Sequence, residues 1–414
     1  MIKIRLAHLG LAMAAIGFTA ATPLLGLSVA VAAETVRSEI GAPLQAAQNL
    51  MKQGKNKEAL AKLRDADNVG NKTAHESYLI ERVRASAASS AGDYETANRA
   101  IEKLIDSGKL NASERKNFED GLIGNYMRAK EYGKANAAIN RALKDGNDPK
   151  LRAYLIQNYY SMGQFGQAQK ELSVELSAQE RAGHTPSEDQ LGMLANLYNR
   201  SGDKSAYVNT IEKLAANYPK VNYWTDLLNR VTAKPGFSNR LTVDVYRLKF
   251  ANNLIKKPSE YLEMAQLVLQ AKAPAEAVKV IDRGYKSGVL GAGADAPRHQ
   301  RLKDLADKTL ADDTKNLAAN EAALVKAKDN DGLLALGYAL VQDGKADKGL
   351  PMMLEAIKTG DLKNPEDAKL RLGEAYAAAG KKQQAISTLR SVRGTDGTAE
   401  LARYWIMAIN HPMS

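Results

Sequence analysis

The sequence predicts an all-α protein in which antiparallel helical hairpins repeat along the chain as an α-solenoid. Stretches beginning at Gly121, Ala153 and Arg371 share small and apolar residues at intervals of four, nine and four residues. A glycine (Gly163, Gly380) separates the two halves of the pattern in two of them. Residues four apart lie on one helix face, so each stretch reads as helix, turn and helix. Such a hairpin cannot bury its apolar face alone and must stack on its neighbours.

The shared positions are Leu122, Tyr126, Ala135 and Ile139; Leu155, Tyr159, Ala168 and Leu172; and Leu372, Tyr376, Ala385 and Leu389. We expect the small alanine to let the two helices approach and the larger residue four places later to fill the space behind it. With Gly373, these positions resemble the tetratricopeptide repeat (TPR) family. The family's tryptophan position is not filled, and Leu389 stands where the family has phenylalanine.

The same spacing extends over most of the chain. First-helix positions and their partners nine residues later are Leu50 and Ala59, Ala88 and Ala97, Tyr126 and Ala135, Tyr159 and Ala168, Tyr198 and Tyr207, Val268 and Ala277, Leu340 and Gly349, and Tyr376 and Ala385. Two doubled steps imply degenerate hairpins near 224–228 and 301–305, which makes about ten hairpins in all. The stretch 398–410 has one apolar face and is predicted to be a capping helix.

Two stretches interrupt the pattern. Residues 177–189 lengthen one connection, and residues 232–239 carry Pro235-Gly236, which stops a helix and permits a bend. We take the second as a linker between an N-terminal array, 34–231, and a C-terminal array, 240–414.

The N-terminus has the order of residues of a secretory signal peptide. Lys3 and Arg5 precede a long apolar stretch that ends in the small residues Val31-Ala32-Ala33. We therefore expect residues 1–33 to be a signal peptide and the mature chain to be exported to the periplasm or secreted. An uncleaved membrane anchor is the alternative, because the stretch is long enough to span a bilayer. Membrane contact is expected only through this segment.

The stretch DADNVGNKTAHE, residues 65–76, matches an EF-hand calcium loop at its first, third, sixth and twelfth places. Val69, however, places an apolar side chain at a ligand position. Gly70 is the type of residue that ends a helix in a left-handed conformation. Thr73 and Glu76 have the spacing of a capping box, in which each side chain binds the other's backbone N–H. We interpret the stretch as a connection between helices, without a metal.

No catalytic, cofactor or metal motif stands out. The chain has no cysteine, and the histidines after the predicted signal, each predicted to lie on the surface or in a loop, are isolated at His75, His184, His299 and His411. The glycine-rich stretch 288–296 follows a helix and lacks the Lys-Ser or Lys-Thr pair of a phosphate loop. No polar cluster breaks the helical pattern, so we expect neither enzymatic activity nor a cofactor. The enzyme alternative is a superhelical cell-wall glycosidase, for which we find no module with paired carboxylates.

The charge balance gives a mild bias towards acidic partners. The formal net charge is +11, and removal of Lys3 and Arg5 with the signal peptide lowers it to +9. Acidic and basic residues alternate along most of the chain, as on solvated helix faces. This pattern, together with export, argues against nucleic-acid binding.

Solenoids bind partners on a concave surface lined by their first helices. The resemblance to TPRs implies that residues two places before the key tyrosine, and one and two places after it, face this groove. They are Gly124, Met127 and Arg128; Gln157, Tyr160 and Ser161; and Asn196, Asn199 and Arg200. Amides can pair with a peptide backbone and arginines with carboxylates. We take six as candidate partner-binding residues: Arg128, Gln157, Tyr160, Asn196, Asn199 and Arg200. The alternative is that they are only solvated helix positions.

These features predict a non-catalytic periplasmic scaffold that binds a protein or an extended peptide during envelope assembly or secretion. A binder of anionic polysaccharide in export is the alternative, because the mature chain is basic.

Overall fold

The computed structural model of the 414-residue chain describes residues 36–146 and 148–413. This part contains 21 α-helices, one short 3-10 helix and no strand, so the all-α prediction is confirmed. None of the helices described is both long enough and apolar enough to cross a membrane. The predicted signal peptide, residues 1–33, lies outside the described residues.

The chain forms two compact units, and the division between them falls between Ala182 and Gly183. This boundary lies in the first of the two interruptions that the sequence shows, 177–189. Helix α8 ends at Arg181, and Gly183 has a left-handed backbone with φ of 78°. The long connection therefore separates two cores, and each unit is described by itself.

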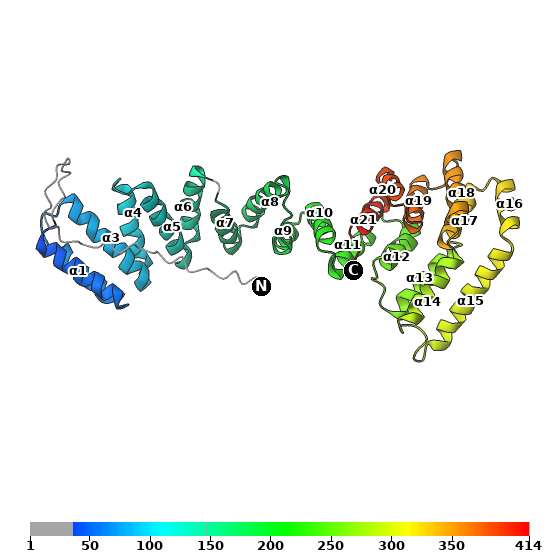
Figure 1. Cartoon of the computed structure of the whole chain (residues 1–414), viewed down its shortest axis with the longest axis horizontal. Coiled ribbons are helices and arrows are strands. Elements are labelled where there is room, and N and C mark those ends of the chain that lie inside the picture. The colour runs from blue at the N-terminus through cyan, green and yellow to red at the C-terminus, as the bar shows by residue number, and fades with distance from the viewer. Residues whose placement is uncertain (1–35, 147, 414) are drawn as a thin grey trace, which may run out of the picture. The chain divides into compact units, whose positions relative to one another are not determined.

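The first unit consists of four successive helical hairpins (Figure 1). Their helices are α1 (Ser38–Lys52), α2 (Asn56–Asp67), α3 (Ala74–Ala91), α4 (Tyr94–Asp106), α5 (Ala112–Arg128), α6 (Tyr132–Asp145), α7 (Pro149–Ser161) and α8 (Phe165–Arg181). The small residues predicted for the second helices are all fully buried: Ala59, Ala97, Ala135 and Ala168. The predicted TPR-like packing is confirmed here.

Buried amides connect neighbouring hairpins of the first unit. The Asn158 side chain on α7 donates to Asn136 Oδ1 on α6 at 2.9 Å. Asn125 on α5 donates to the Ser89 hydroxyl on α3 at 3.0 Å. Because a buried amide without a partner is unfavourable, such pairs favour one stacking register over others.

The second unit begins with α9 (Glu188–Ser201) and α10 (Lys204–Asn217), which pack as a hairpin. It continues with α11 (Val221–Thr232), η1 (Asn239–Leu241), α12 (Thr242–Ala251), α13 (Pro258–Gln270), α14 (Pro274–Lys286), α15 (Ala296–Lys315), α16 (Leu317–Ala327), α17 (Asn330–Gln342), α18 (Ala346–Thr359), α19 (Pro365–Ala378), α20 (Lys382–Ser391) and α21 (Thr398–Asn410). The pairs α13–α14, α17–α18 and α19–α20 form the other predicted hairpins.

Two glycines of the second unit explain how closely these helices approach. A Cβ on Gly349 of α18 would collide with the carbonyl oxygen of Gly337 on α17. A Cβ on Gly373 of α19 would lie 2.5 Å from Cγ of Leu389 on α20. Gly373 and Leu389, which carried part of the family resemblance, therefore contact each other as the pattern predicts.

The two degenerate hairpins are irregular. Helix α11 packs on α10, whereas α12 packs on α13 and on the C-terminal helix α21. In the second degenerate hairpin, predicted near 301–305, helix α16 has no buried residue. Helix α15 buries only His299, Leu302 and Ala306 over its 20 residues, so the hairpin near 301–305 has little apolar surface on which α16 can pack.

The stretch 232–239, predicted to be a linker between arrays, lies inside the second unit. Ser238 N donates to the Asp396 carbonyl at 3.0 Å, and Lys234 Nζ contacts Glu400 at 2.5 Å. On the preceding helix, Trp224 packs edge-to-face against Tyr404 of α21, with ring centroids 6.5 Å apart. Because these contacts tie the stretch to the C-terminal helices, the second unit begins well before the predicted C-terminal array.

The connection between α2 and α3 matches the predicted capping box. Thr73 Oγ1 accepts from Glu76 N at 3.1 Å, and Thr73 N donates to the Glu76 carboxylate at 2.8 Å. The prediction for Gly70 is wrong, because the left-handed residue is Asn71, with φ of 52°. Asparagine tolerates this conformation better than most side chains.

The prediction that His299 lies on the surface is also wrong. His299 is 2% exposed at the start of α15, and its Nδ1 accepts from Gly291 N at 3.1 Å. The glycine-rich stretch 288–296 is therefore held by a buried histidine at this point.

Candidate functional site

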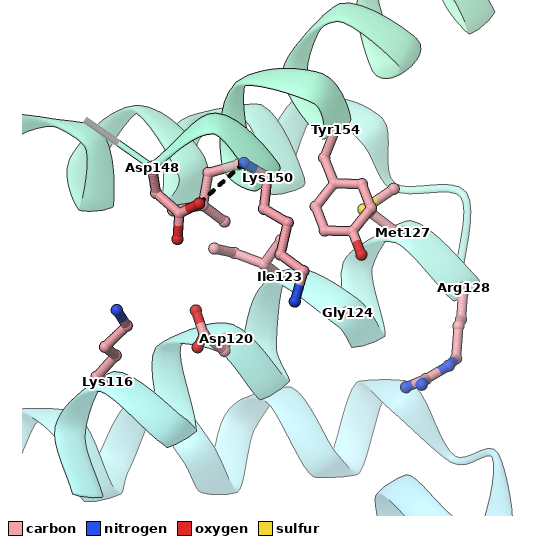
Figure 2. A pocket seen from close by; sticks show the side chains of 10 residues that line it. Lys116, Asp120, Ile123, Gly124, Met127, Arg128, Asp148, Lys150 and Tyr154 are labelled. Atoms are coloured by element: carbon pink, nitrogen blue, oxygen red, sulfur yellow. Dashed lines mark hydrogen bonds between the residues drawn. The ribbon is translucent and has the colours of Figure 1, made fainter. Parts of the chain in front are cut away.

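A pocket of about 210 Å³ lies between α5 and the N-terminal part of α7 in the first unit (Figure 2). Both are first helices of their hairpins, the class of helix from which the sequence predicts a binding surface. The lining residues are Lys116, Asp120, Ile123, Gly124, Met127 and Arg128 from α5, and Asp148, Lys150, Leu151 and Tyr154 from α7 and its cap.

The pocket has apolar walls, and on α5 a glycine without a side chain leaves room within it. Ile123 and Leu151 are largely buried and belong to the core between the hairpins, and Met127 and Tyr154 pack against that core. A Cβ on Gly124 would meet only Arg128 Nη1, at 3.7 Å, so the absence of a side chain here keeps the pocket open. An apolar cavity with polar groups at its edge is the usual form of a ligand site.

Charged side chains of both signs surround this apolar surface. Lys116, Lys150 and Arg128 are cationic, and Asp120 and Asp148 are anionic. Burial raises the pKa of Asp120 above its ordinary value, the Lys116 ammonium lowers it, and the Asp148 carboxylate raises it again. The pocket therefore presents charges that a polar ligand could complement.

Asp148 has a second role because it caps α7. Its Oδ1 accepts from Lys150 N at 2.9 Å, and Pro149 follows at the first helical position, where its fixed φ suits a helix start. The sequence Asp-Pro-Lys thus begins α7 and places both a carboxylate and an ammonium at the pocket (Figure 2).

The structure brings part of the predicted groove to this pocket. Gly124, Met127 and Arg128 line it, and Arg128 Nη1 lies 3.5 Å from Asn125 Oδ1. Gln157 and Tyr160 lie further along α7 and are not among its lining residues. The Tyr160 ring instead packs edge-to-face against Phe165, with centroids 5.4 Å apart.

The other three candidates belong to the second unit. Asn196, Asn199 and Arg200 are exposed on α9, and Arg200 Nε donates to Asn196 Oδ1 at 3.1 Å. Because the six candidates are divided between two units, a single continuous groove stays a prediction.

The pocket residues that the sequence pattern did not predict are Lys116, Asp120, Ile123, Asp148, Lys150, Leu151 and Tyr154. A usable signal existed on α5, because residues 116, 120, 124, 127 and 128 recur at spacings of three and four on one helix face. The TPR resemblance indicates only the turn around the key tyrosine, whereas the pocket extends two turns further towards the N-terminus of α5.

The expectation that no polar cluster interrupts the helical pattern is wrong. In the second unit, the side chains of Asp244, Arg247, Glu276 and Glu374 are all at most 6% exposed and lie together, with Arg371 beside them. The members lie on three helices that are far apart in sequence, so no local spacing reveals the whole cluster. Among the described residues, no group of three or more metal-ligating side chains is gathered that could hold a metal ion.

No protein-family model matches the sequence, and no curated protein matches it. Among solved structures, the chain resembles the apo form of RapI, with 11% identity, coverage of 66% of this chain and 99% of the other, and a TM-score of 0.29. It also resembles the TPR domain of P58(IPK), with 11% identity, 89% and 98% coverage, and a TM-score of 0.21. The pentatricopeptide repeat protein PPR10 from maize gives 14% identity, 90% and 62% coverage, and a TM-score of 0.29. At such low TM-scores, the helical-repeat fold rests on the hairpins of this chain itself.

Proposed function

We propose that this chain is an exported, non-catalytic adaptor that binds an extended segment of a partner protein at the pocket between α5 and α7. The observation that carries the proposal is the pocket itself, which lies between first helices and is open at Gly124. An apolar side chain of the partner would pack against Ile123, Met127 and Leu151. Backbone and charged groups of the partner would meet the surrounding polar groups.

The mixed charges around the pocket favour a polypeptide ligand. Lys150 and Arg128 can bind acidic side chains, while Asp120 and Asp148 can bind basic ones. A peptide offers both signs within a few residues. The pocket therefore suits a segment of mixed charge around an apolar anchor.

The proposed location is the periplasm, in envelope assembly or secretion. It is supported by the charged start, the apolar stretch and the small residues Val31-Ala32-Ala33 of the N-terminal sequence. N-terminal sequencing of the exported form is expected to begin near Glu34. A retained Met1 in a membrane fraction would instead indicate an uncleaved anchor.

A second candidate function is binding of an anionic polysaccharide. It is favoured by three cationic side chains at one pocket: Lys116, Arg128 and Lys150. Such binding is dominated by exposed charge and fades as salt rises. Titration with polygalacturonate at low and high salt distinguishes this function from peptide binding, whose apolar part persists in salt.

The proposal is tested with tagged full-length protein that is crosslinked in native cell envelopes and recovered. Gly124→Leu fills the pocket. Gly133→Leu serves as a matched control, because Gly133 is exposed on α6 and a Cβ added there would have no neighbour within 4 Å. We expect the wild type and Gly133→Leu to recover the same protein partner and Gly124→Leu to lose it. Equal recovery by all three would place the interface elsewhere.

A further inference from the structure

Five ionisable side chains meet in the interior of the second unit. Asp244 and Arg247 lie on α12, Glu276 on α14, and Arg371 and Glu374 on α19. The Tyr338 ring of α17 lies under the Arg247 guanidinium, 4.0 Å from centroid to Cζ. In this buried ion cluster, the hydrogen-bonded pair Asp244 and Arg371 is 127 residues apart in sequence.

Two of the three carboxylates are well bonded. Arg247 makes a bidentate ion pair with Glu276, in which Nε donates to Oε1 at 3.0 Å and Nη2 donates to Oε2 at 2.9 Å. Asp244 accepts from Arg247 Nη1 at 2.9 Å and from Arg371 Nε and Nη2 at 3.2 and 3.1 Å. Two guanidinium charges are thus matched by two carboxylate charges.

Glu374 is the third carboxyl group of the cluster, and no arginine of the cluster donates a hydrogen bond to it. The nearest guanidinium nitrogen is Arg247 Nη1, and its distance of 3.9 Å is too long for a hydrogen bond. Oε2 accepts only from the Tyr338 hydroxyl, at 3.1 Å, and Oε1 is buried without a hydrogen-bond partner. An ionised carboxylate so placed would be a third buried negative charge, which is strongly unfavourable.

The electrostatics agree with this geometry. Burial and then the Asp244 carboxylate raise the pKa of Glu374 well above its ordinary value, although Arg247 and Arg371 oppose the rise. Burial would also raise the pKa of Asp244, but Arg371 and Arg247 outweigh it and hold that pKa below its ordinary value. Charge in the cluster is therefore balanced when Glu374 is neutral.

Several charged groups on α18 and α21, two of the helices that pack against α19, are paired elsewhere. On α18, Lys348 contacts Glu321 and Lys358 contacts Glu355. On α21, Glu400 contacts Lys234 and Arg403 contacts Glu212. The charged groups that act most strongly on Glu374 are Asp244, Arg247, Arg371 and Glu276, which lie on α12, α14 and α19.

We propose that a proton bound to the Glu374 carboxyl stabilises the packing of helices α17 and α19 in the second unit. These helices then separate more readily when that proton is lost. Loss of the proton introduces an unbalanced negative charge between α12, α17 and α19, which the Tyr338 hydroxyl alone cannot stabilise. A group whose proton is bound more tightly in the folded state stabilises the fold below its unfolded pKa. This stabilisation is lost as pH rises towards its folded pKa.

The test compares the full-length wild type with Glu374→Gln, an isosteric replacement for the protonated carboxyl. Glu355→Gln, at an exposed position of α18, is the matched control. Hydrogen exchange of peptides from α17 and α19 is measured at several values from about pH 4 to about pH 9, each variant being compared with the wild type at the same pH. Comparison at equal pH cancels the intrinsic dependence of exchange on hydroxide.

We expect wild type and Glu374→Gln to be equally protected at about pH 4.5 and to diverge above it. The ratio of their opening constants would approach about tenfold per pH unit, with the wild type opening more. Glu355→Gln is expected to follow the wild type. The same protection in wild type and Glu374→Gln at every pH would overturn the proposal. A Glu374→Gln variant that is less protected than the wild type, or unfolded, would also overturn it, because the fold would then need the charge on Glu374.

Discussion

Arg37 binds both carboxylate oxygens of Glu76, with Nε to Oε1 at 2.9 Å and Nη2 to Oε2 at 2.8 Å. Its guanidinium also donates to the carbonyl oxygens of Gly70 and Asn71, at 3.2 and 3.0 Å. Asn71 and Glu76 stand at the seventh and twelfth places of the calcium-like stretch, where an EF-hand provides a carbonyl and a carboxylate ligand. An internal cation engages these oxygens, so calcium would have to displace Arg37.

The Arg37–Glu76 pair predicts an acid-sensitive step in unfolding. The hydrogen bond from Arg37 and the capping bond from Thr73 lower the pKa of Glu76 to about 2. A depressed pKa gives stability that is present above the unfolded value and is lost as pH falls towards the folded value. We expect Arg37→Ala to raise the pH at which helicity is lost on acid titration, measured by circular dichroism. Lys62→Ala, which breaks the exposed Lys62–Asp65 pair, is the control and is expected to leave that pH unchanged.

Two glycines in helix interiors are predicted to respond in opposite ways to alanine. Gly349→Ala forces a methyl group against the Gly337 carbonyl and should lower stability by about 1–3 kcal/mol. Gly124→Ala places its methyl group in ordinary contact with one flexible side chain, Arg128, and should raise stability by about 0.5–1 kcal/mol, because glycine is a poor helix former. Urea unfolding measures both. A destabilised Gly124→Ala variant would show that α5 is strained at that position.

The key tyrosines of two successive hairpins are predicted to differ. Tyr126 is 5% exposed and its hydroxyl donates to Glu102 at 2.6 Å, so Tyr126→Ala should cost about 3–5 kcal/mol. Tyr159 is only half-buried at the edge of its core. We expect Tyr159→Ala to cost less than Tyr126→Ala in thermal unfolding. The reverse order would mean that the second hairpin packs more tightly than described.

The exposed candidates on α9 carry a separate prediction about binding. If Asn196 and Asn199 hold the backbone of an extended partner, replacing both with alanine should weaken binding by roughly 1–3 kcal/mol for each hydrogen bond left unmade. The helicity should not change, because both side chains are exposed. Titration of the variant against the recovered partner measures the effect, and wild-type affinity would exclude α9 from the interface.

Arg128 provides a test of the charge of the partner. It is exposed at the end of α5 and lines the pocket. Arg128→Ala is expected to weaken binding of an acidic partner at low salt and to have less effect at high salt. An effect that does not change with salt would indicate that Arg128 contributes through packing.

The hairpins could be predicted from sequence because their determinants are local. A small residue at positions such as Ala59 or Ala168, and a larger apolar residue four places later, suffice to pair two helices. The family glycine, Gly373, was recognised for the same reason, since its neighbour Leu389 is only 16 residues away. The capping box at the start of α3 could be predicted for the same reason, because Thr73 and Glu76 are only three residues apart and form the box that this spacing predicts.

Features that depend on distant contacts were not predictable in this way. The buried ion cluster joins Asp244 to Arg371, 127 residues away, and each member resembles an ordinary charged helix residue in its own segment. The attachment of 232–239 to the second unit depends on contacts with Asp396 and with Glu400 of α21, and the sequence of α21 shows an apolar face but not the segments that pack on it. The pocket was found only in part, because Lys116, Asp120, Asp148 and Lys150 lie beyond the turn that carries the repeat pattern.

The central claim, that a partner binds at the α5–α7 pocket, is tested most directly by photocrosslinking from defined positions. A benzoylphenylalanine is placed at Tyr154, which lines the pocket, or at Arg99, whose side chain is 65% exposed on α4. Irradiation of native envelopes is predicted to give one discrete protein adduct from position 154 that disappears when Gly124→Leu is added, and none from position 99. An adduct from position 99 alone, or one from position 154 that survives Gly124→Leu, would contradict the account.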